Sequence, residues 1–224
     1  WLGTDELGRD QLTRLLYAGQ ISLKIGFAVA LISTFVGTIF GALAGYFGKA
    51  TDQVLMRLTD LFLVVPAIAI LALILKLFGH SDLVIILVLA ALFWMGVARV
   101  VRGQVLSLRE KEYVEAARAS GASPLRIIVR HIIPNIIGPI MLNVTLGVAG
   151  AIITESTLSF LGFGVQPPQA SWGSMLSEAR DQINTAPWLS VFPGLAIFLT
   201  VLGLNLLCDV LRDILDPQST TRRA

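Results

Sequence analysis

Residues 109–135 read REKEYVEAARASGASPLRIIVRHIIPN, the longest polar segment between two strongly apolar regions of the chain. Glu, Lys, Ala and Arg, which favour helices, dominate residues 110–119. Gly121 follows where helices commonly end in a left-handed glycine. Ser123 and Pro124 are typical of the cap and first turn of a second helix. The pattern predicts two short helices joined by a glycine turn.

The second helix is expected to be amphipathic and to end at Pro134. Its apolar residues recur at the i, i+3, i+4 and i+7 spacing of one helix face: Leu125, Ile128, Val129 and Ile132. In the first helix, Glu115 and Arg118 have the spacing of an ion pair. Small side chains such as Ala116 permit close approach by another protein. From the residues alone, anionic lipid headgroups and a protein partner are equally suitable for this segment.

Five apolar stretches are long enough to cross a bilayer, because a spanning helix needs roughly 20 residues. We expect spans at about residues 25–47, 58–78, 83–101, 136–153 and 188–208. The chain is 55% hydrophobic and 14% charged, with a mean hydropathy of +0.77. Soluble domains have roughly 25% charged residues. The expected fold class is therefore an all-α, polytopic membrane protein.

Two local features accompany these spans. Asp10 is expected to cap a short helix within residues 1–20, lying at the membrane surface. At the start of the second span, Asp60 is expected to pair with Arg57.

The placement of Lys and Arg predicts the orientation. With five spans, the segments 48–57, 99–135 and 209–224 share one side and hold twelve of the seventeen basic residues, so this side should be cytoplasmic. The expected organisation is an extracytoplasmic segment 1–20, a transmembrane domain 21–224, a cytoplasmic loop 102–135, an extracytoplasmic loop 154–187 and a cytoplasmic tail 209–224. A chain start outside, without a signal peptide, suggests a missing upstream span.

Motifs of several enzyme classes are absent from the sequence. There is no GxxxxGK[ST] phosphate loop, no HExxH and no Gly-x-Ser-x-Gly. One cysteine, Cys208, and two distant histidines predict no metal site. The net charge of +2 gives no reason to expect nucleic acid. We expect no catalysis and no cofactor; an ion channel and an intramembrane enzyme are the competing classes.

Glu155 is the main ionisable residue inside the spans, at the outer end of the fourth. An acid at bilayer depth is costly and often lines a water path. The alternative is a carboxylate at the outer interface, satisfied by Ser156, Thr157 and water.

The string EYVEAARASGASPLRIIVRHIIPN resembles the cytoplasmic EAA loop of permease subunits of binding-protein-dependent ABC importers. Glu115, Ala116, Ala117 and Gly121 match the pattern, and Ile133-Pro134 replaces Leu-Pro. Further segments are similar to the second permease of the dipeptide/oligopeptide type. They are LGTDELGRD, GYFG, RLTDLFLVVP, LSFLGFGVQPP, SWGSML and LRDILDP, and they cover nearly the whole chain.

The resemblance implies a MetI-like permease core of five transmembrane helices in a bacterial cytoplasmic membrane, without the usual first span. It implies four kinds of protein and ligand partner: a second homologous permease, two cytoplasmic ATP-binding subunits, an external solute-binding protein and a peptide substrate. Nickel chelates, opines or other small solutes are the alternative substrates. The resemblance also implies coupling roles for these residues: Glu115, Ala116, Ala117, Gly121, Arg118 and Arg126.

Overall fold

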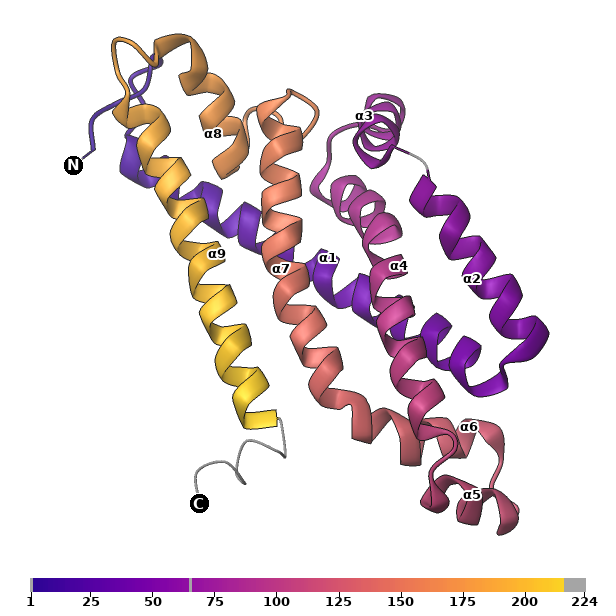
Figure 1. The fold of residues 1–224 in the computed structure, drawn as a ribbon. Coiled ribbons are helices and arrows are strands. Elements are labelled where there is room, and N and C mark those ends of the chain that lie inside the picture. Colours follow the sequence, from indigo (N-terminus) through magenta and orange to yellow (C-terminus); the bar gives the residue numbers. More distant parts are fainter. Residues whose placement is uncertain (1, 65, 216–224) are drawn as a thin grey trace. The chain divides into compact units, whose positions relative to one another are not determined.

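The computed structural model describes residues 2–64 and 66–215 (Figure 1). Most of these residues are helical, as the sequence predicted, and the β-type pairing among them is an isolated bridge between Thr4 and Asp10. The α-helices are α1 (Gln11–Phe47), α2 (Lys49–Val64), α3 (Ala67–Phe78), α4 (Asp82–Leu108), α5 (Glu112–Ala119), α6 (Pro124–Ile127), α7 (Ile137–Phe160), α8 (Trp172–Ala179) and α9 (Trp188–Leu215).

Four stretches in the described part of the chain are long and apolar enough to cross a membrane: Gln11–Phe47, Asp82–Leu108, Pro124–Phe160 and Trp188–Ile214. Helices α2 and α3 meet this criterion only as a pair, which would make a fifth span. The predicted span 58–78 is thus divided between two helices. Pro66 is the N-cap of the second, a position that suits proline because it has no N–H to donate inside a helix.

The short surface helix expected before the first span is not a separate element. Instead, α1 runs for 37 residues without interruption. Asp10 does cap its start, since the Asp10 carboxylate accepts hydrogen bonds from the Thr13 backbone N–H (2.7 Å) and hydroxyl (2.6 Å). No proline follows before Phe47 to break the helix.

Residue contacts divide the chain into two compact units, and each is described by itself. The first comprises Trp1–Ala30, Pro66–Ala90 and Leu146–Leu206. The second comprises Leu31–Val65, Ala91–Thr145 and Leu207–Ala224.

In the first unit, the first half of α1 packs against α8 and the second half of α7. The buried centre of this packing consists of Ala18, Ala30, Val148, Ile152, Trp172 and Met175. Small residues bring the helices together. A Cβ on Gly26 would lie 2.7 Å from Ile152 Cγ1, and one on Gly19 would lie 2.9 Å from the Trp172 ring.

In the second unit, the last part of α1 packs closely against α4. Gly37, Gly41 and Gly45 form a stripe at i, i+4 and i+8, and a Cβ on Gly41 would lie 2.5 Å from the carbonyl oxygen of Ala98. This spacing is typical of membrane helices whose backbones approach each other closely. The two helices therefore offer a firm base for the polar loop that follows α4.

Candidate functional site

The turn after α5 is fixed by its backbone. Gly121 has φ +82°, in the left-handed region. Its N–H donates to the Arg118 carbonyl (3.0 Å), and the next N–H, of Ala122, donates to the Ala117 carbonyl (3.1 Å). These two bonds define a Schellman motif, in which glycine satisfies the last carbonyls of a helix. The predicted glycine turn is confirmed.

The second helix starts as predicted. Ser123 is the N-cap, and its hydroxyl accepts from the Arg126 N–H at 3.4 Å, with Pro124 in the first turn. The α-helical part of α6 is short. It continues as a π-helical turn, Ile128–Ile132, and then as a 3-10 turn, Ile133–Ile136, which leads into α7.

The predicted apolar face is right at two positions and wrong at the other two, and a π-helical turn sets its phase from Ile128 onward. Ile128 and Ile132 are buried, but Leu125 and Val129 are exposed. A π-helical turn closes with an i→i+5 bond, here from the Ile133 N–H to the Ile128 carbonyl, so it holds more residues than an α-helical turn. The buried side chains then recur at every fourth position: Ile128, Ile132, Ile136 and Ile140.

One buried cluster joins the loop to the spans within the second unit. Its members come from α1, α4, α5, α6 and the start of α7: Ala42, Val97, Val101, Val105, Val114, Ile127, Ile128, Ile132, Ile136 and Ile140. Ala117 and Ala122 pack against the same cluster. Figure 1 shows α5 and α6 at the end of α4. Because the loop shares its core with the helices, a force applied to α5 reaches the spans through close-packed side chains.

The outward surface of α5 is polar and small. Glu115 and Ala116 are exposed, while Val114 is fully buried beneath them. Arg118 does not form the predicted ion pair with Glu115 among the described residues. Its guanidinium lies over the ring of Tyr46, 5.9 Å from the centroid, because the end of α1 offers an aromatic face there.

An open hollow of about 570 Å³ adjoins the glycine turn. It is lined by Tyr46, Phe47, Arg109, Glu110, Glu115, Arg118, Ala122 and Pro124. Arg109 Nη1 also donates to the Gly45 carbonyl at 3.0 Å, which links the end of α4 to the end of α1. The remaining predicted coupling residue, Arg126, is exposed on α6.

Glu155 lies in α7, in the first unit, and is fully buried at 0% exposure. Its carboxylate accepts from the Ser159 hydroxyl at 2.6 Å and from the Ser22 hydroxyl at 3.4 Å. The Ser22 oxygen in turn accepts from the Trp172 N–H at the start of α8 (3.2 Å). Thr157 is not one of the partners proposed for an interfacial carboxylate, because its hydroxyl bonds to the Ile153 carbonyl.

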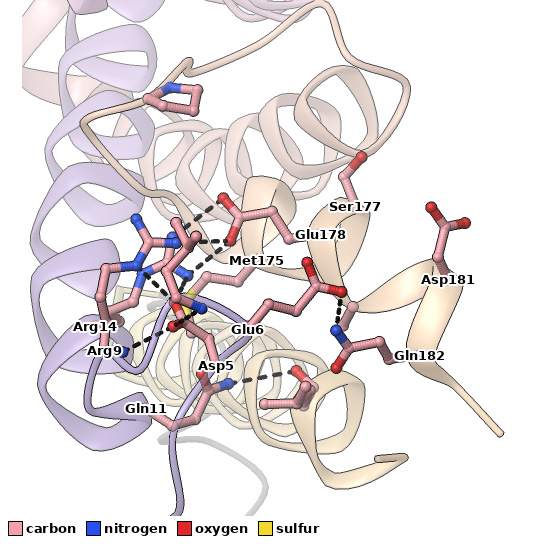
Figure 2. Close-up of a pocket in the computed structure, with 14 residues that line it drawn as sticks. Asp5, Glu6, Arg9, Gln11, Arg14, Met175, Ser177, Glu178, Asp181 and Gln182 are labelled. Atoms are coloured by element: carbon pink, nitrogen blue, oxygen red, sulfur yellow. Dashed lines mark hydrogen bonds and ion pairs between the residues drawn. The ribbon is translucent and has the colours of Figure 1, made fainter. Parts of the chain in front are cut away.

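A second polar network, which the sequence analysis did not single out, holds the segment before α1 against α8 (Figure 2). Arg14 Nη1 lies 2.7 Å from Asp5 Oδ2 and 2.7 Å from Glu178 Oε2. The network borders a pocket of about 420 Å³. Partial burial raises the pKa of Asp5, but hydrogen bonds from Arg9 and from the Leu7 N–H outweigh it and bring that pKa below its usual value. The charge density of the LGTDELGRD segment was the signal for this network.

The loop geometry and the apolar helices can be compared with known proteins. A family model described as "Binding-protein-dependent transport system inner membrane component" matches residues 37–220. The chain belongs to this family. It is therefore a multi-pass inner-membrane protein and the permease component of an ABC importer, which is not the subunit that hydrolyses ATP.

Relatives resemble this permease over most of its length. The oligopeptide transport system permease protein OppC of Haemophilus influenzae is 44% identical, over 97% of this chain and 70% of its own. The dipeptide transport system permease protein DppC of Alkalihalophilus pseudofirmus is 42% identical, over 97% of this chain and 72% of its own.

Solved structures share the fold of this permease. A chain of the inward-facing MetNI methionine ABC transporter superposes with a TM-score of 0.75, covering 95% of this chain and 100% of that one at 16% identity. An amino acid ABC transporter gives a TM-score of 0.64 at 19% identity, covering 93% and 98%. At such identities the likeness shows the fold alone, and it confirms the MetI-like architecture.

Proposed function

We propose that this permease subunit carries di- and oligopeptides across the cytoplasmic membrane, driven by ATP hydrolysis in partner subunits. Two findings support the proposal. The relatives that align along nearly the whole chain are named for oligopeptide and dipeptide transport. The cluster that joins the polar loop to the spans gives the chain a way to receive a mechanical signal.

The working assembly has four kinds of protein. This permease pairs with a second, homologous permease; two ATPases bind on the cytoplasmic side, and a solute-binding protein delivers the peptide from outside. The start of the chain lies outside and its end in the cytoplasm, with the loop 102–135 facing the ATPases. The support for this orientation is the distribution of basic residues, twelve of seventeen on the proposed cytoplasmic side.

Coupling takes place at the exposed surface of α5. Glu115 and Ala116 meet the ATPase, Ala117 and Gly121 hold the helix at its angle, and Arg118 and Arg126 border the contact. When the ATPases close, α5 is displaced. The displacement passes through Val114 to the cluster, because close-packed cores transmit strain rather than absorb it. The spans then rock between outward and inward access.

Glu155 has a separate proposed role on the translocation path. It is enclosed by serine hydroxyls in the structure, so it would meet the path in a conformation in which α8 has moved away from Ser22. An acid retained inside a span at a cost in free energy supports a functional role.

The experiment that tests coupling compares two charge reversals. Glu115→Lys changes the proposed contact on α5, and Asp209→Lys, at an exposed acid of α9 outside the coupling loop, is the matched control. The importer is reconstituted with its partners, and ATPase recovery and uptake of a labelled tripeptide are measured. We expect Glu115→Lys to lower both by about tenfold or more, since a like-charge contact at an interface costs on the order of 1–2 kcal/mol.

The outcome for the control decides the interpretation. Asp209→Lys should retain most of the ATPase and the uptake. Equal losses in the two variants, or normal uptake by Glu115→Lys, would contradict a coupling surface centred on Glu115.

A further inference from the structure

Helix α2 carries a polar stripe along one face. Gln53, Arg57 and Asp60 stand at i, i+4 and i+7, which places them in line on an α-helix. Gln53 and Arg57 are exposed, and Asp60 is partly exposed. An open hollow of about 550 Å³ runs beside the stripe and is lined by Gln53, Val54, Arg57, Leu58 and Leu61.

Asp60 does not pair with Arg57, as its spacing had predicted, but with Arg99 of α4. Arg99 Nη2 lies 2.5 Å from Asp60 Oδ1, and the two side chains are 50% and 48% exposed. The Arg99 guanidinium reaches Asp60 because α2 and the part of α4 from Ala91 onward belong to the second unit and face each other there.

A second ion pair between the same helices provides a contrast. Arg102 donates through both Nε and Nη2 to the two oxygens of Asp52, with the Nη2 contact at 2.6 Å. The side chains of Arg102 and Asp52 are 33% and 18% exposed, respectively. The forked, more enclosed pair ties α2 to α4, whereas the single-bonded, open pair at Asp60 leaves most of the Arg99 guanidinium available.

The position of the open pair restricts what can cover it. Asp60 comes 12 residues after Gly48, the turn residue that follows α1, so it lies about 18 Å along α2 from that turn at 1.5 Å per residue. Its partner Arg99 lies within α4, which is long and apolar enough to cross a membrane. Ionisable groups inside a spanning helix are costly against lipid and face water or protein. The face of α1 that bears Leu31, Phe35 and Ile39 is exposed too, but it is wholly apolar and suits lipid.

We propose that the Gln53–Arg57–Asp60 stripe lines the aqueous route through the importer, and that Asp60 and Arg99 exchange partners with the charged ends of a passing peptide. The free α-ammonium group replaces Arg99 at Asp60, or the α-carboxylate replaces Asp60 at Arg99. A half-exposed ion pair is readily separated because water screens its attraction. The stripe is supported by the side-chain geometry alone. The assignment of a zwitterionic substrate, in contrast, rests on the proposed peptide transport.

The first experiment asks whether the stripe meets water. In a Cys208→Ala background, Leu61→Cys and the lipid-face control Phe35→Cys are labelled in the assembled, reconstituted importer with a membrane-impermeant, cationic thiol reagent. Leu61 lies one turn beyond Arg57 and lines the same hollow. Leu61 is 68% exposed and Phe35 is 69% exposed, so exposure itself does not distinguish the sites. We expect Leu61→Cys to react about tenfold faster or more, since the thiolate forms in water but not in lipid. Equal rates would overturn the aqueous route.

The second experiment asks whether the peptide contacts the ion pair. A saturating tripeptide, delivered by the binding protein during ATP turnover, should slow the labelling of Leu61→Cys. The double variant Asp60→Asn/Arg99→Gln, which removes both charges and leaves neither unpaired, should abolish this protection. The corresponding variant of the forked pair, Asp52→Asn/Arg102→Gln, should keep it. Protection that survives in Asp60→Asn/Arg99→Gln would overturn the contact.

Uptake of the tripeptide by the wild-type importer is measured alongside. Absence of uptake together with fast labelling of Leu61→Cys would overturn the peptide substrate and support the aqueous route. Normal uptake together with slow labelling would overturn the route and leave the proposed function intact.

Discussion

Replacement of Gly121 tests the coupling turn without introducing a clash. No atom lies within 4 Å of a Cβ placed on Gly121, so the cost of a side chain there is conformational. The φ of +82° costs an L-residue about 1–2 kcal/mol, and a β-branched residue lies at or above the upper end. We therefore expect Gly121→Ala to destabilise the turn by about 1 kcal/mol and Gly121→Val by about 2 kcal/mol or more. Because 1.4 kcal/mol is a factor of ten, the native turn in the valine variant is disfavoured by about thirtyfold.

Two measurements read out this change. Limited proteolysis of the reconstituted importer reports opening of the loop, and the ratio of peptide taken up to ATP hydrolysed reports coupling. Both should worsen in the order glycine, alanine, valine, while the permease stays inserted. Gly103→Ala is the control: Gly103 also has open space around it but lies inside α4, where alanine is expected to be neutral or slightly stabilising. A valine variant with wild-type protease resistance and coupling would refute the reasoning.

Three further predictions concern other parts of the chain. Gly41→Val should destabilise the permease by about 1–3 kcal/mol, measured by thermal aggregation in detergent, because a side chain there meets the Ala98 carbonyl. Glu155→Ala should cost about 1–3 kcal/mol in the same assay by leaving the buried hydroxyls of Ser22 and Ser159 without their acceptor. Since the pKa of Asp5 is lowered in the fold, its stabilisation is present above its usual pKa and is lost as the pH falls through the lower, folded value. The protection of residues 2–10 from hydrogen exchange, relative to the exchange rate of an unfolded chain at the same pH, should therefore stay high at pH 5 and fall only in stronger acid.

The sequence predicted most accurately what depends on near neighbours along the chain. The glycine turn, the Ser123 cap and the Asp10 cap each involve residues within about five positions, and their chemistry is specific. The all-α class followed from apolar stretches of membrane length. The EAA-type resemblance then identified the family that the family model confirms.

The interpretation was wrong where distant elements decide the outcome. The i,i+3 spacing favoured Asp60 with Arg57, but α4 brings the Arg99 guanidinium within 2.5 Å. Likewise, the partners of Glu155 include Ser22, which is 133 positions away in the sequence. The phase of the apolar face after Leu125 depends on a π-helical turn, and a fixed 3.6-residue period cannot anticipate one.

The Schellman turn also bears on how such a loop can change its partner over evolution. Its shape is held by main-chain N–H groups and one glycine, and the helix before it is anchored by the inward-facing Val114. The outward side chains of Glu115 and Ala116 have no part in holding that shape, to which Ala116 contributes only its main-chain carbonyl. A lineage can therefore vary them to recognise a different ATPase while the loop keeps its fold. Compatibility between permease and ATPase becomes a property of a few surface positions, separable by single substitutions from the stability of the membrane domain.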